Sequence, residues 1–543
     1  MIEDFKDSEI ILCSNIHIDK NYDNVLDVSK STLVGHLRTH SEYVGNNYSI
    51  IPRERNSLIV ACPYNTALKC NYMTFRNPDY ENEYVFAFVD SVEYISDEST
   101  RINFIIDVWH TYHDKFNINK VFVEREHVND DTFGKHTIPE QLETGEYTIK
   151  SETDATDLQD VCPVLAATVN PEMEAVYSSY CGNRYESLGY YIFKGASMTT
   201  YDGGDQADAL DHFIGEYAEA SKTDAIVSIF MAPKKLVGWT ASGTWNGALT
   251  YSWRNALDVF EHTNPIYTDY NIPVTFTSLD VTRPTTFGSY TPKNNKCYCF
   301  PYQFINLTNN NGGNAKYNYE DFSSNAISFD ITGIISPSCS IHATPKNYKN
   351  QTKAYNDGLQ GGKYPICSWQ NDIFTNWLTQ QGVNIALDTT KNILGVVGGI
   401  STGNVNATVG GFMGIFGTMS NIYQHSLIPP QAEGNINGGD IGAANSKTTF
   451  TLQTIQIREE IIKTIDAFFS RYGYKVNEIK EPTLHNRTQF DFIKVGGTDN
   501  LISGKIPARD LDEINAIARR GVTIFHNIAN FGNYTISNPI VTP

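Results

Sequence analysis

Runs of β-forming residues dominate the first 130 positions of the chain. Residues 84–89 are a dense aromatic and aliphatic run that alternates between two faces, as a strand requires. Residues 102–109 and 120–123 form two further runs, and the polar break at 96–99 is typical of a hairpin turn between the first two. The pattern predicts an N-terminal domain built mainly from strands.

A different pattern follows in the middle of the chain. Apolar side chains recur at i, i+3, i+4 and i+7 within residues 208–220, which predicts an amphipathic helix. Residues 225–230 are continuously apolar and predict a buried strand. Together these elements indicate a smaller α+β domain over 160–290. Strand and turn patterns then resume from 298 to about 340.

The C-terminal region predicts a strand over 448–457 followed by two helices. The first helix carries an apolar stripe and ends at Gly473, where a left-handed backbone costs glycine least. The second begins at a pair of acidic residues that resembles a capping box, and Gly521 ends it. The stripe consists of Ile461, Ile465, Phe468, Phe469 and Tyr472, and the acidic pair is Asp510 and Glu513.

Composition and charge narrow the class of protein. The 543 residues exceed the size of one ordinary domain, and 41% hydrophobic with 19% charged residues indicates a globular chain. The net charge of −20 disfavours a protein that grips nucleic acid, since that function needs a basic surface. Residues 124–160 hold 11 acidic and 3 basic side chains, which we interpret as a solvated connection between domains.

The nine cysteines are scattered and form no CxxC pair, so we expect reduced thiols rather than a disulfide framework. The N-terminus lacks a basic region followed by an apolar run, and no window holds 18 consecutive apolar residues. We therefore expect neither a signal peptide nor an ordinary transmembrane helix. Synthesis in a cytoplasm follows from this interpretation.

One segment differs from the rest of the chain. Residues 392–432 contain no Asp, Glu, Lys or Arg over 41 positions, and eight of the 28 residues from 392 to 419 are glycine. GxxxG spacings let apolar helices approach closely in lipid. Conditional membrane insertion is one interpretation, and a buried loop in an oligomer interface is the other. The apolar candidates for membrane contact are Ile393, Leu394, Val396, Val397, Ile400, Val409, Phe412, Met413, Ile415, Phe416 and Met419.

Motifs for catalysis, cofactors and metals do not form complete sites. Residues 399–403 match G-x-S-x-G, but they lie in the charge-free segment without acidic or histidine partners. The histidine-rich stretch 110–114 and the pair Cys297 and Cys299 each lack a second ligand pair at metal-site spacing. The acidic carboxylates of 124–160 suit a solvated face better than a glycosidase, and 358–363 is no phosphate loop. We therefore expect no catalytic residues, no cofactor and no metal.

Several short motifs, in order, resemble the tail-knob or distal tube proteins of small short-tailed phages of Gram-positive bacteria, the picovirus type. The motifs keep their order and spacing over roughly residues 60–130 and 390–540, and the second range includes the charge-free segment. The resemblance depends on the shared order of the motifs. They are residues 72–80, 86–89, 106–108 and 123–128, then 468–477, 502–504, 521–526 and 532–534.

The resemblance implies a mainly β (α+β), multi-domain fold. It would contain β-barrel or sandwich domains like those of tail tubes, a smaller α+β domain and a long Gly-rich hydrophobic loop. It also implies a homohexamer that extends the tail and binds other tail proteins, namely an upper tube or collar and a tip or cell-wall-degrading component. The expected domains are 1–150 (tube-like β), 160–290 (α+β insert), 295–370 (β-rich), 371–447 (hydrophobic loop) and 448–543 (tube-like α+β).

The resemblance further implies a function in the virion. DNA would pass through the lumen without specific binding, and the loop would plug the tube and later enter the host cell membrane. The acidic balance is consistent with such a lumen, because carboxylates repel phosphate over about 8 Å at physiological salt. Two other classes stay open at this point. They are a host-facing receptor-binding or adhesion protein and a virion-associated cell-wall hydrolase.

Overall fold

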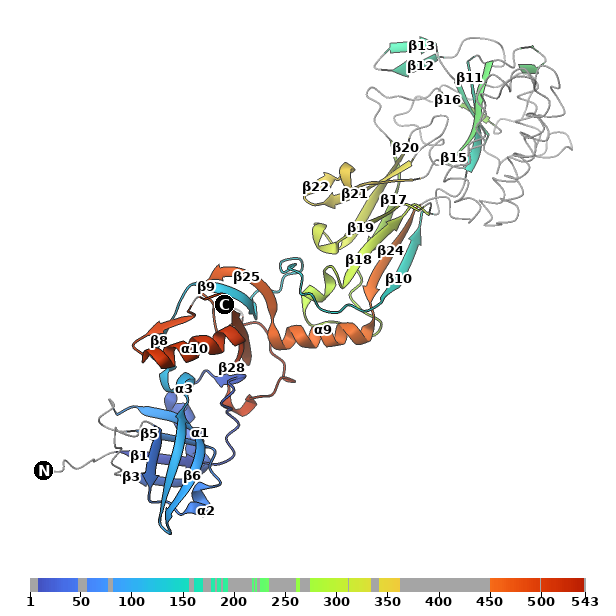
Figure 1. Ribbon diagram of the computed structural model, residues 1–543. Helices are drawn as coiled ribbons and strands as arrows, with labels where there is room; N and C mark the ends of the chain where they lie inside the picture. Colours follow the sequence, from blue (N-terminus) through green and yellow to red (C-terminus); the bar gives the residue numbers. More distant parts are fainter. Residues whose placement is uncertain are drawn as a thin grey trace, which may run out of the picture. The chain divides into compact units, whose positions relative to one another are not determined.

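The computed structural model consists mainly of strands, as the fold class predicted from the sequence requires (Figure 1). It describes residues 8–46, 56–76, 82–155, 274–310, 312–333, 341–361, 450–498 and 500–541, with short stretches between 161 and 263. The chain divides into two compact units, and each is described by itself. Unit 1 comprises Met1–Gly145, Thr286–Tyr298 and Glu459–Pro543, and unit 2 comprises Glu146–Thr285 and Cys299–Arg458.

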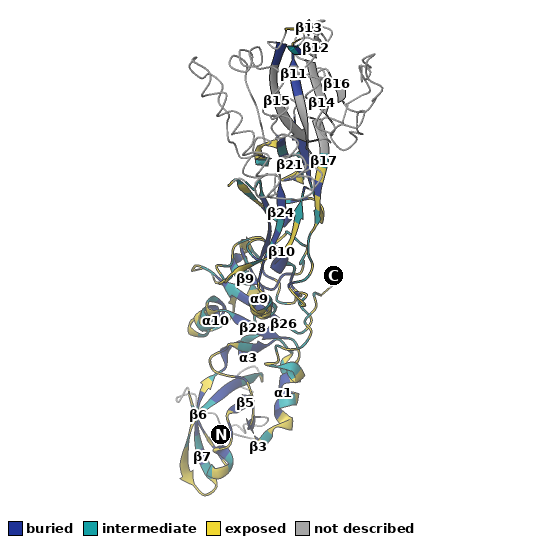
Figure 2. Cartoon of the chain, turned by 90° about the vertical axis from the view of Figure 1, so that its right-hand side faces the viewer, coloured by how far each residue is buried: buried dark blue, intermediate teal, exposed yellow. Residues whose placement is uncertain are grey.

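Unit 1 begins with a six-stranded antiparallel sheet in the order β3-β1-β5-β6-β7-β4. The hairpin predicted at 96–99 is confirmed, since Ser96 pairs with Ser99 between β6 and β7. The outer end of this hairpin is exposed (Figure 2). The strands are β1 (Glu9–Cys13), β3 (Ser41–Asn46), β4 (Ser57–Val60), β5 (Tyr72–Arg76), β6 (Tyr84–Ser96) and β7 (Ser99–Ile106), and the helices α1 (Lys30–Thr39) and α2 (Tyr64–Ala67) accompany them.

An apolar core lies on one face of this sheet. Leu12 of β1, Met73 of β5 and Ala87 of β6 are fully buried in it. Phe86 points to the opposite face of β6 and is also fully buried. Because burying a phenylalanine or methionine side chain contributes roughly 1.5–3 kcal/mol, this part of β6 is stabilised from both sides. That burial explains why the run 84–89 is continuously apolar.

The strand predicted over 102–109 is too long at its C-terminal end. β7 stops at Ile106, and a short helix, α3 (Val108–Tyr112), follows. Asp107 caps this helix, because its side chain accepts a hydrogen bond from the His110 N–H at 3.2 Å. Trp109, which we expected on a strand, is therefore on a helix and is 1% exposed.

A second sheet of unit 1 joins the two ends of the chain. Its order is β2-β28-β26-β9-β25, and β2 runs parallel to β28 while the other pairs are antiparallel. The strand predicted over 120–123 is confirmed as β9. The strands are β2 (Asn24–Leu26), β9 (Val121–Glu126), β25 (Tyr474–Lys480), β26 (Phe490–Val495) and β28 (Val522–Phe525), and β8 (Phe116–Ile118) pairs separately with β27 (Ile502–Gly504).

The first predicted C-terminal helix is confirmed as α9 (Glu459–Tyr472). Its buried side is shifted by one position at the start, because Ile462 rather than Ile461 is buried, together with Ile465, Asp466 and Phe469. Gly473 ends the helix with φ +65°, and its N–H donates to the Phe469 carbonyl at 2.9 Å. A Cβ at Gly473 would lie 2.0 Å from the Glu126 carbonyl oxygen, so only glycine fits there.

The second predicted helix is α10 (Ala508–Arg520), which begins earlier than its acidic pair indicated. Pro507 is the N-cap and makes no side-chain capping bond, while Asp510 accepts a hydrogen bond from the Tyr112 hydroxyl at 2.9 Å. The predicted capping box is therefore wrong. Gly521 ends the helix as predicted, since its N–H donates to the Ile517 carbonyl at 3.1 Å and its φ is +97°.

A buried carboxylate on α9 holds the segment Thr286–Tyr298 within unit 1. Asp466 is 1% exposed and accepts hydrogen bonds from the backbone N–H groups of Lys293 (2.9 Å) and Asn294 (3.0 Å). The Tyr290 hydroxyl donates to the same carboxylate at 2.6 Å. This explains why a charged side chain occupies the buried face of α9: it supplies acceptors for a segment without regular secondary-structure partners.

The described residues of unit 2 form four sheets. Their orders are β10-β24-β18-β19, β15-β11-β14-β16, β12-β13 and β17-β20-β21-β22, with β23 paired to β21. The strands predicted over 225–230 and 448–457 are confirmed as β15 (Ile226–Pro233) and β24 (Thr451–Ile457). The predicted helix 208–220 lies largely outside the described residues. The other strands are β10 (Tyr147–Asp154), β11 (Val161–Ala167), β12 (Tyr177–Tyr180), β13 (Asn183–Glu186), β14 (Gly189–Phe193), β16 (Phe260–Thr263), β17 (Val274–Thr282), β18 (Gln303–Thr308), β19 (Asn314–Tyr317), β20 (Ala326–Gly333), β21 (Ile341–Tyr348), β22 (Gln351–Lys353) and β23 (Leu359–Gln360).

Five of the nine cysteines lie in the described residues as buried thiols outside any disulfide, as the sequence predicted. Cys297 and Cys299 are among them. Burial raises the pKa of the Cys13 and Cys70 thiols to about 12. These side chains therefore behave as small buried groups.

Candidate functional site

The residues predicted to contact a membrane lie outside the described residues. All eleven apolar candidates between 392 and 419, and the G-x-S-x-G match at 399–403, belong to this part of the chain. Their role stays a prediction. Among the described residues, no helix is both long and apolar enough to cross a membrane.

The two histidines of the 110–114 stretch have different partners. His110 is 3% exposed, its Nδ1 lies 2.7 Å from the Asp107 carboxylate, and its Nε2 accepts from the Leu26 N–H at 3.0 Å. Both nitrogens of His110 therefore hold buried structure together. His113 instead lies with its Nε2 2.6 Å from an oxygen of Asp27. This contact leads to a polar cluster that the sequence did not reveal.

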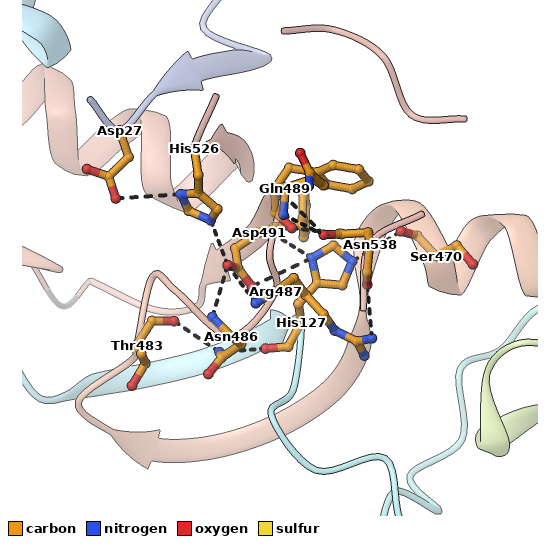
Figure 3. Close-up of polar contacts among 12 residues, drawn as sticks. Asp27, His127, Ser470, Thr483, Asn486, Arg487, Gln489, Asp491, His526 and Asn538 are labelled. Atoms are coloured by element: carbon orange, nitrogen blue, oxygen red, sulfur yellow. Dashed lines mark hydrogen bonds and ion pairs between the residues drawn. The ribbon is translucent and has the colours of Figure 1, made fainter. Parts of the chain in front are cut away.

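We call this set of side chains at one edge of the second sheet the Asp–His cluster; it consists of Asp27, His113, His485, Asp491 and His526 (Figure 3 draws three of its members with their neighbours). Asp27 directly follows β2 and His526 directly follows β28. These strands are parallel neighbours, so their carboxyl ends meet at the same edge.

The antiparallel strand β26 completes the edge. Its first residue, Phe490, pairs with Phe525, so the connection that leads into β26 also reaches this edge and brings His485 there. Asp491 is the second residue of β26 and is 2% exposed. Local strand endings and register thus bring together residues that are hundreds of positions apart in the sequence.

The hydrogen bonds of Asp491 define the direction of its bond with His526. Asp491 Oδ2 accepts from the backbone N–H groups of Asn486 (3.0 Å) and Arg487 (3.2 Å), so this oxygen is an acceptor. His526 Nε2 lies 3.0 Å from the same oxygen and therefore donates its proton to it. Burial raises the pKa of Asp491, while the bonds to His526 and Arg487 oppose that increase.

Asp27 is surrounded by imidazole groups. His485 Nε2 lies 2.8 Å from Asp27 Oδ2, and His526 Nδ1 lies 3.7 Å from the same oxygen. Burial by itself raises the pKa of Asp27, but the hydrogen bond from His113 and the nearby imidazoles outweigh it and hold the pKa below the usual value. Asp27, His485 and His526 each offer one possible metal-ligand atom, and these three atoms lie within 4.8 Å of one another.

His127 lies next to Asp491 of the cluster and holds backbone groups of neighbouring elements. Its Nδ1 accepts from the Phe492 N–H at 2.9 Å, and its Nε2 lies 3.2 Å from the Ser470 carbonyl oxygen. Complete burial, helped by the positive charge of Arg487, lowers the pKa of His127 to about 3. His127 is therefore neutral at physiological pH.

A second buried charge centre corrects our interpretation of residues 124–160 as solvated. The Glu140 side chain is 0% exposed and pairs with Arg125 and Lys296, whose side chains are 13% and 3% exposed. Glu140 also accepts a hydrogen bond from the Lys475 N–H at 2.9 Å. Part of the acidic run is thus an interior feature of unit 1, and not a solvated connection.

Two protein families match this chain, one in its N-terminal part and one in its C-terminal half. Residues 262–539 match the family described as the C-terminal domain of the tail knob protein gp9 of Bacillus phage phi29. Residues 6–117 match the family described as the N-terminus of the caudoviral major tail protein. The first match spans more than half of the chain.

Whole proteins and a solved structure agree with these matches. Tail knob protein gp9 of Bacillus phage phi29 is 23% identical, and the match covers 95% of this chain and 92% of that protein. The corresponding protein of Bacillus phage PZA is 24% identical, with 90% of each chain covered. The tail knob protein gp12 of bacteriophage C1 shares the fold with a TM-score of 0.61 at 13% identity, over 98% of this chain and 100% of that one. The chain therefore belongs to the family of phage tail knob proteins, which are structural components of the virion.

Proposed function

We propose that six copies of the chain form a ring that extends the tail and through which DNA leaves the virion. Membership of the tail knob family is the observation that carries this proposal. The match of residues 6–117 to a major tail protein supports a tube-like role for the N-terminal region. A head-to-tail contact that closes on itself generates such a ring. The ring would bind other tail proteins, and its role would be structural rather than enzymatic.

We propose in addition that residues 392–432 plug the ring and then enter the host membrane. An apolar segment of this size promotes aggregation if it stays exposed, so it should be sequestered before release. The absence of charged side chains from 41 residues removes a cost of roughly 2.5–3.5 kcal/mol for each charge at the bilayer centre. Neither apolar part reaches the about 20 residues of a single span, so several copies would insert together through GxxxG contacts.

The test introduces charge into the segment. A variant with Phe412, Ile415 and Phe416 replaced by Asp should still form rings but should lose both leakage of dye-loaded liposomes and infection. The matched control adds the same three charges outside the segment, by replacing Asn435, Asn437 and Asn445 with Asp, and should behave as the wild type. Normal infection by the first variant would show that the segment is only a plug or an interface loop.

Ring formation is tested separately by negative-stain electron microscopy of the purified chain. Six-fold hollow rings or short tubes are expected. Compact monomers or trimers at every concentration would contradict the hexamer and favour a receptor-binding protein instead.

A further inference from the structure

We propose that Asp27, His485 and His526 of the Asp–His cluster bind one divalent transition-metal ion, with Zn²⁺ as the representative. This runs against our sequence-based expectation of no metal site. The three residues supply one carboxylate oxygen and two imidazole nitrogens, a donor set that suits zinc and related metals. Their ligand atoms lie within 4.8 Å of one another.

The strongest argument is the unsatisfied nitrogen of His526. This side chain is 8% exposed, and its Nδ1 has no hydrogen-bond partner among the described residues. Since Nε2 donates to Asp491, Nδ1 is the nitrogen of this ring that is left to bind a metal. Nδ1 faces the Asp27 carboxylate across 3.7 Å, a distance too long for a hydrogen bond between them. A cation between them would satisfy both.

Asp491 plays the part expected of a partner to a metal ligand. Histidines that bind metals nearly always donate their other ring N–H to a carboxylate or carbonyl, which fixes the tautomer. His526 makes this bond to Asp491 at 3.0 Å. Asp491 is in turn held by backbone N–H groups of the connection that carries His485. His113 similarly positions Asp27 through its second oxygen.

The distances suit a site that forms when the His485 ring, which stacks on the His526 ring with centroids 4.0 Å apart, turns toward the ion. Zinc binds nitrogen and oxygen at about 2.0–2.2 Å, so ligand atoms of a tetrahedral site lie roughly 3.3 Å apart. The Asp27 oxygen is 2.8 Å from His485 and 3.7 Å from His526, which brackets this value. The His485 side chain is 59% exposed, so it can rotate and leaves a path by which the ion enters. Three protein ligands leave a fourth position for water.

The ion would crosslink segments of unit 1 that are distant in the sequence. Asp27 belongs to the N-terminal part of the chain, and His485 and His526 belong to its C-terminal part. A metal bound by all three would tie the short parallel pair β2 and β28 to the connection before β26. Binding that favours the folded state stabilises it by mass action, so the melting temperature should rise with metal concentration.

The test uses the full-length chain, stripped with a chelator and kept reduced with a phosphine. Titration with Zn²⁺ alone in a calorimeter should give one ion per chain, and the melting temperature should rise. His485→Ala, at an exposed position that tolerates truncation, and Asp27→Asn should each weaken binding at least tenfold. Asp491→Asn should weaken it by about 10–100-fold, as loss of an outer-shell partner does elsewhere. Mg²⁺, which prefers oxygen ligands, should not bind.

The control is His17→Ala, which removes an exposed histidine outside the cluster and should bind Zn²⁺ as the wild type does. A wild-type chain that takes up no stoichiometric Zn²⁺ would overturn the proposal, and would mean that a proton on His526 balances Asp27. Binding that survives unchanged in both His485→Ala and Asp27→Asn would overturn it as well.

Discussion

Replacing Glu140 by glutamine removes the common counter-ion of two buried cations. Arg125 and Lys296 both pair with this carboxylate, and the Lys296 side chain is only 3% exposed. Glutamine has the same size and keeps an oxygen that accepts from the Lys475 N–H. The substitution therefore removes the charge and replaces the oxygen that accepts from Arg125 by an NH2 group, which cannot accept.

The magnitude follows from the environment of the cations. Removing one partner of a buried ion pair costs about 3–5 kcal/mol, because the remaining charge is desolvated without compensation. Here the lower end applies. Lys296 keeps its contact with the Tyr474 ring, whose centroid is 5.3 Å from Nζ, and Arg125 is partly exposed. We expect a loss of about 3 kcal/mol, or roughly 100-fold in the opening equilibrium, since each 1.4 kcal/mol is a factor of ten.

Hydrogen exchange followed by mass spectrometry measures this locally, which matters because a two-unit chain need not unfold in one step. Peptides covering β9 and β25 should lose roughly 100-fold protection in Glu140→Gln. Glu143→Gln is the matched control: Glu143 is exposed in the same stretch, so its change should stay within about 0.5 kcal/mol. Protection of β9 and β25 within a few-fold of wild type in Glu140→Gln would refute the reasoning.

Two further predictions concern His127 and Gly473. His127 has a pKa of about 3 in the folded chain and about 6.5 in the unfolded chain, so the unfolded chain binds more protons between these pH values. The free energy of unfolding therefore falls as the pH is lowered through this range, by up to about 1.4 kcal/mol per pH unit. His127→Gln should lack this loss, and parallel pH profiles of melting temperature would contradict the assignment. The Cβ added by Gly473→Ala would collide with the Glu126 carbonyl, whereas the Cβ added by Gly497→Ala has open space at a similar φ. Gly497→Ala should therefore lower the free energy of unfolding by about 1–2 kcal/mol, and Gly473→Ala should lower it by clearly more. Equal losses in denaturant titrations would show that the close contact relaxes.

The elements that the sequence predicted well are those fixed by local periodicity. The alternation over 84–89, the run at 120–123 and the ending of α9 at Gly473 each depend on neighbours within a few residues. Where local signals competed, the prediction was wrong: Asp107 caps α3 and stops β7, although the apolar run continues to Trp109. An N-cap inside an apolar run is a signal that could have revealed this helix.

The polar centres could not be predicted, because they depend on long-range pairing. Asp27 and His526 meet only because β2 lies parallel to β28, and that register is not encoded by either strand alone. In the sequence, nothing distinguishes Glu140 from the other acidic residues of 124–160. Its burial depends on Lys296, which is far away in the chain. The histidines at 110 and 113 lack metal-site spacing in the sequence, and the fold gives them separate partners, Asp107 and Asp27.

Buried carboxylates also change how the net charge of −20 bears on the DNA-conducting lumen that we propose. Asp107, Asp466 and Asp491 are each no more than 2% exposed and are committed to hydrogen bonds inside unit 1. They cannot present charge to passing phosphates, so the formal charge overstates the repulsion available. Screening confines repulsion to about 8 Å at physiological salt, which leaves only exposed carboxylates to act. The repulsion hypothesis is therefore tested by neutralising exposed groups such as Asp97 and Glu98, at the β6–β7 turn, and not by altering the acidic residues that hold the fold.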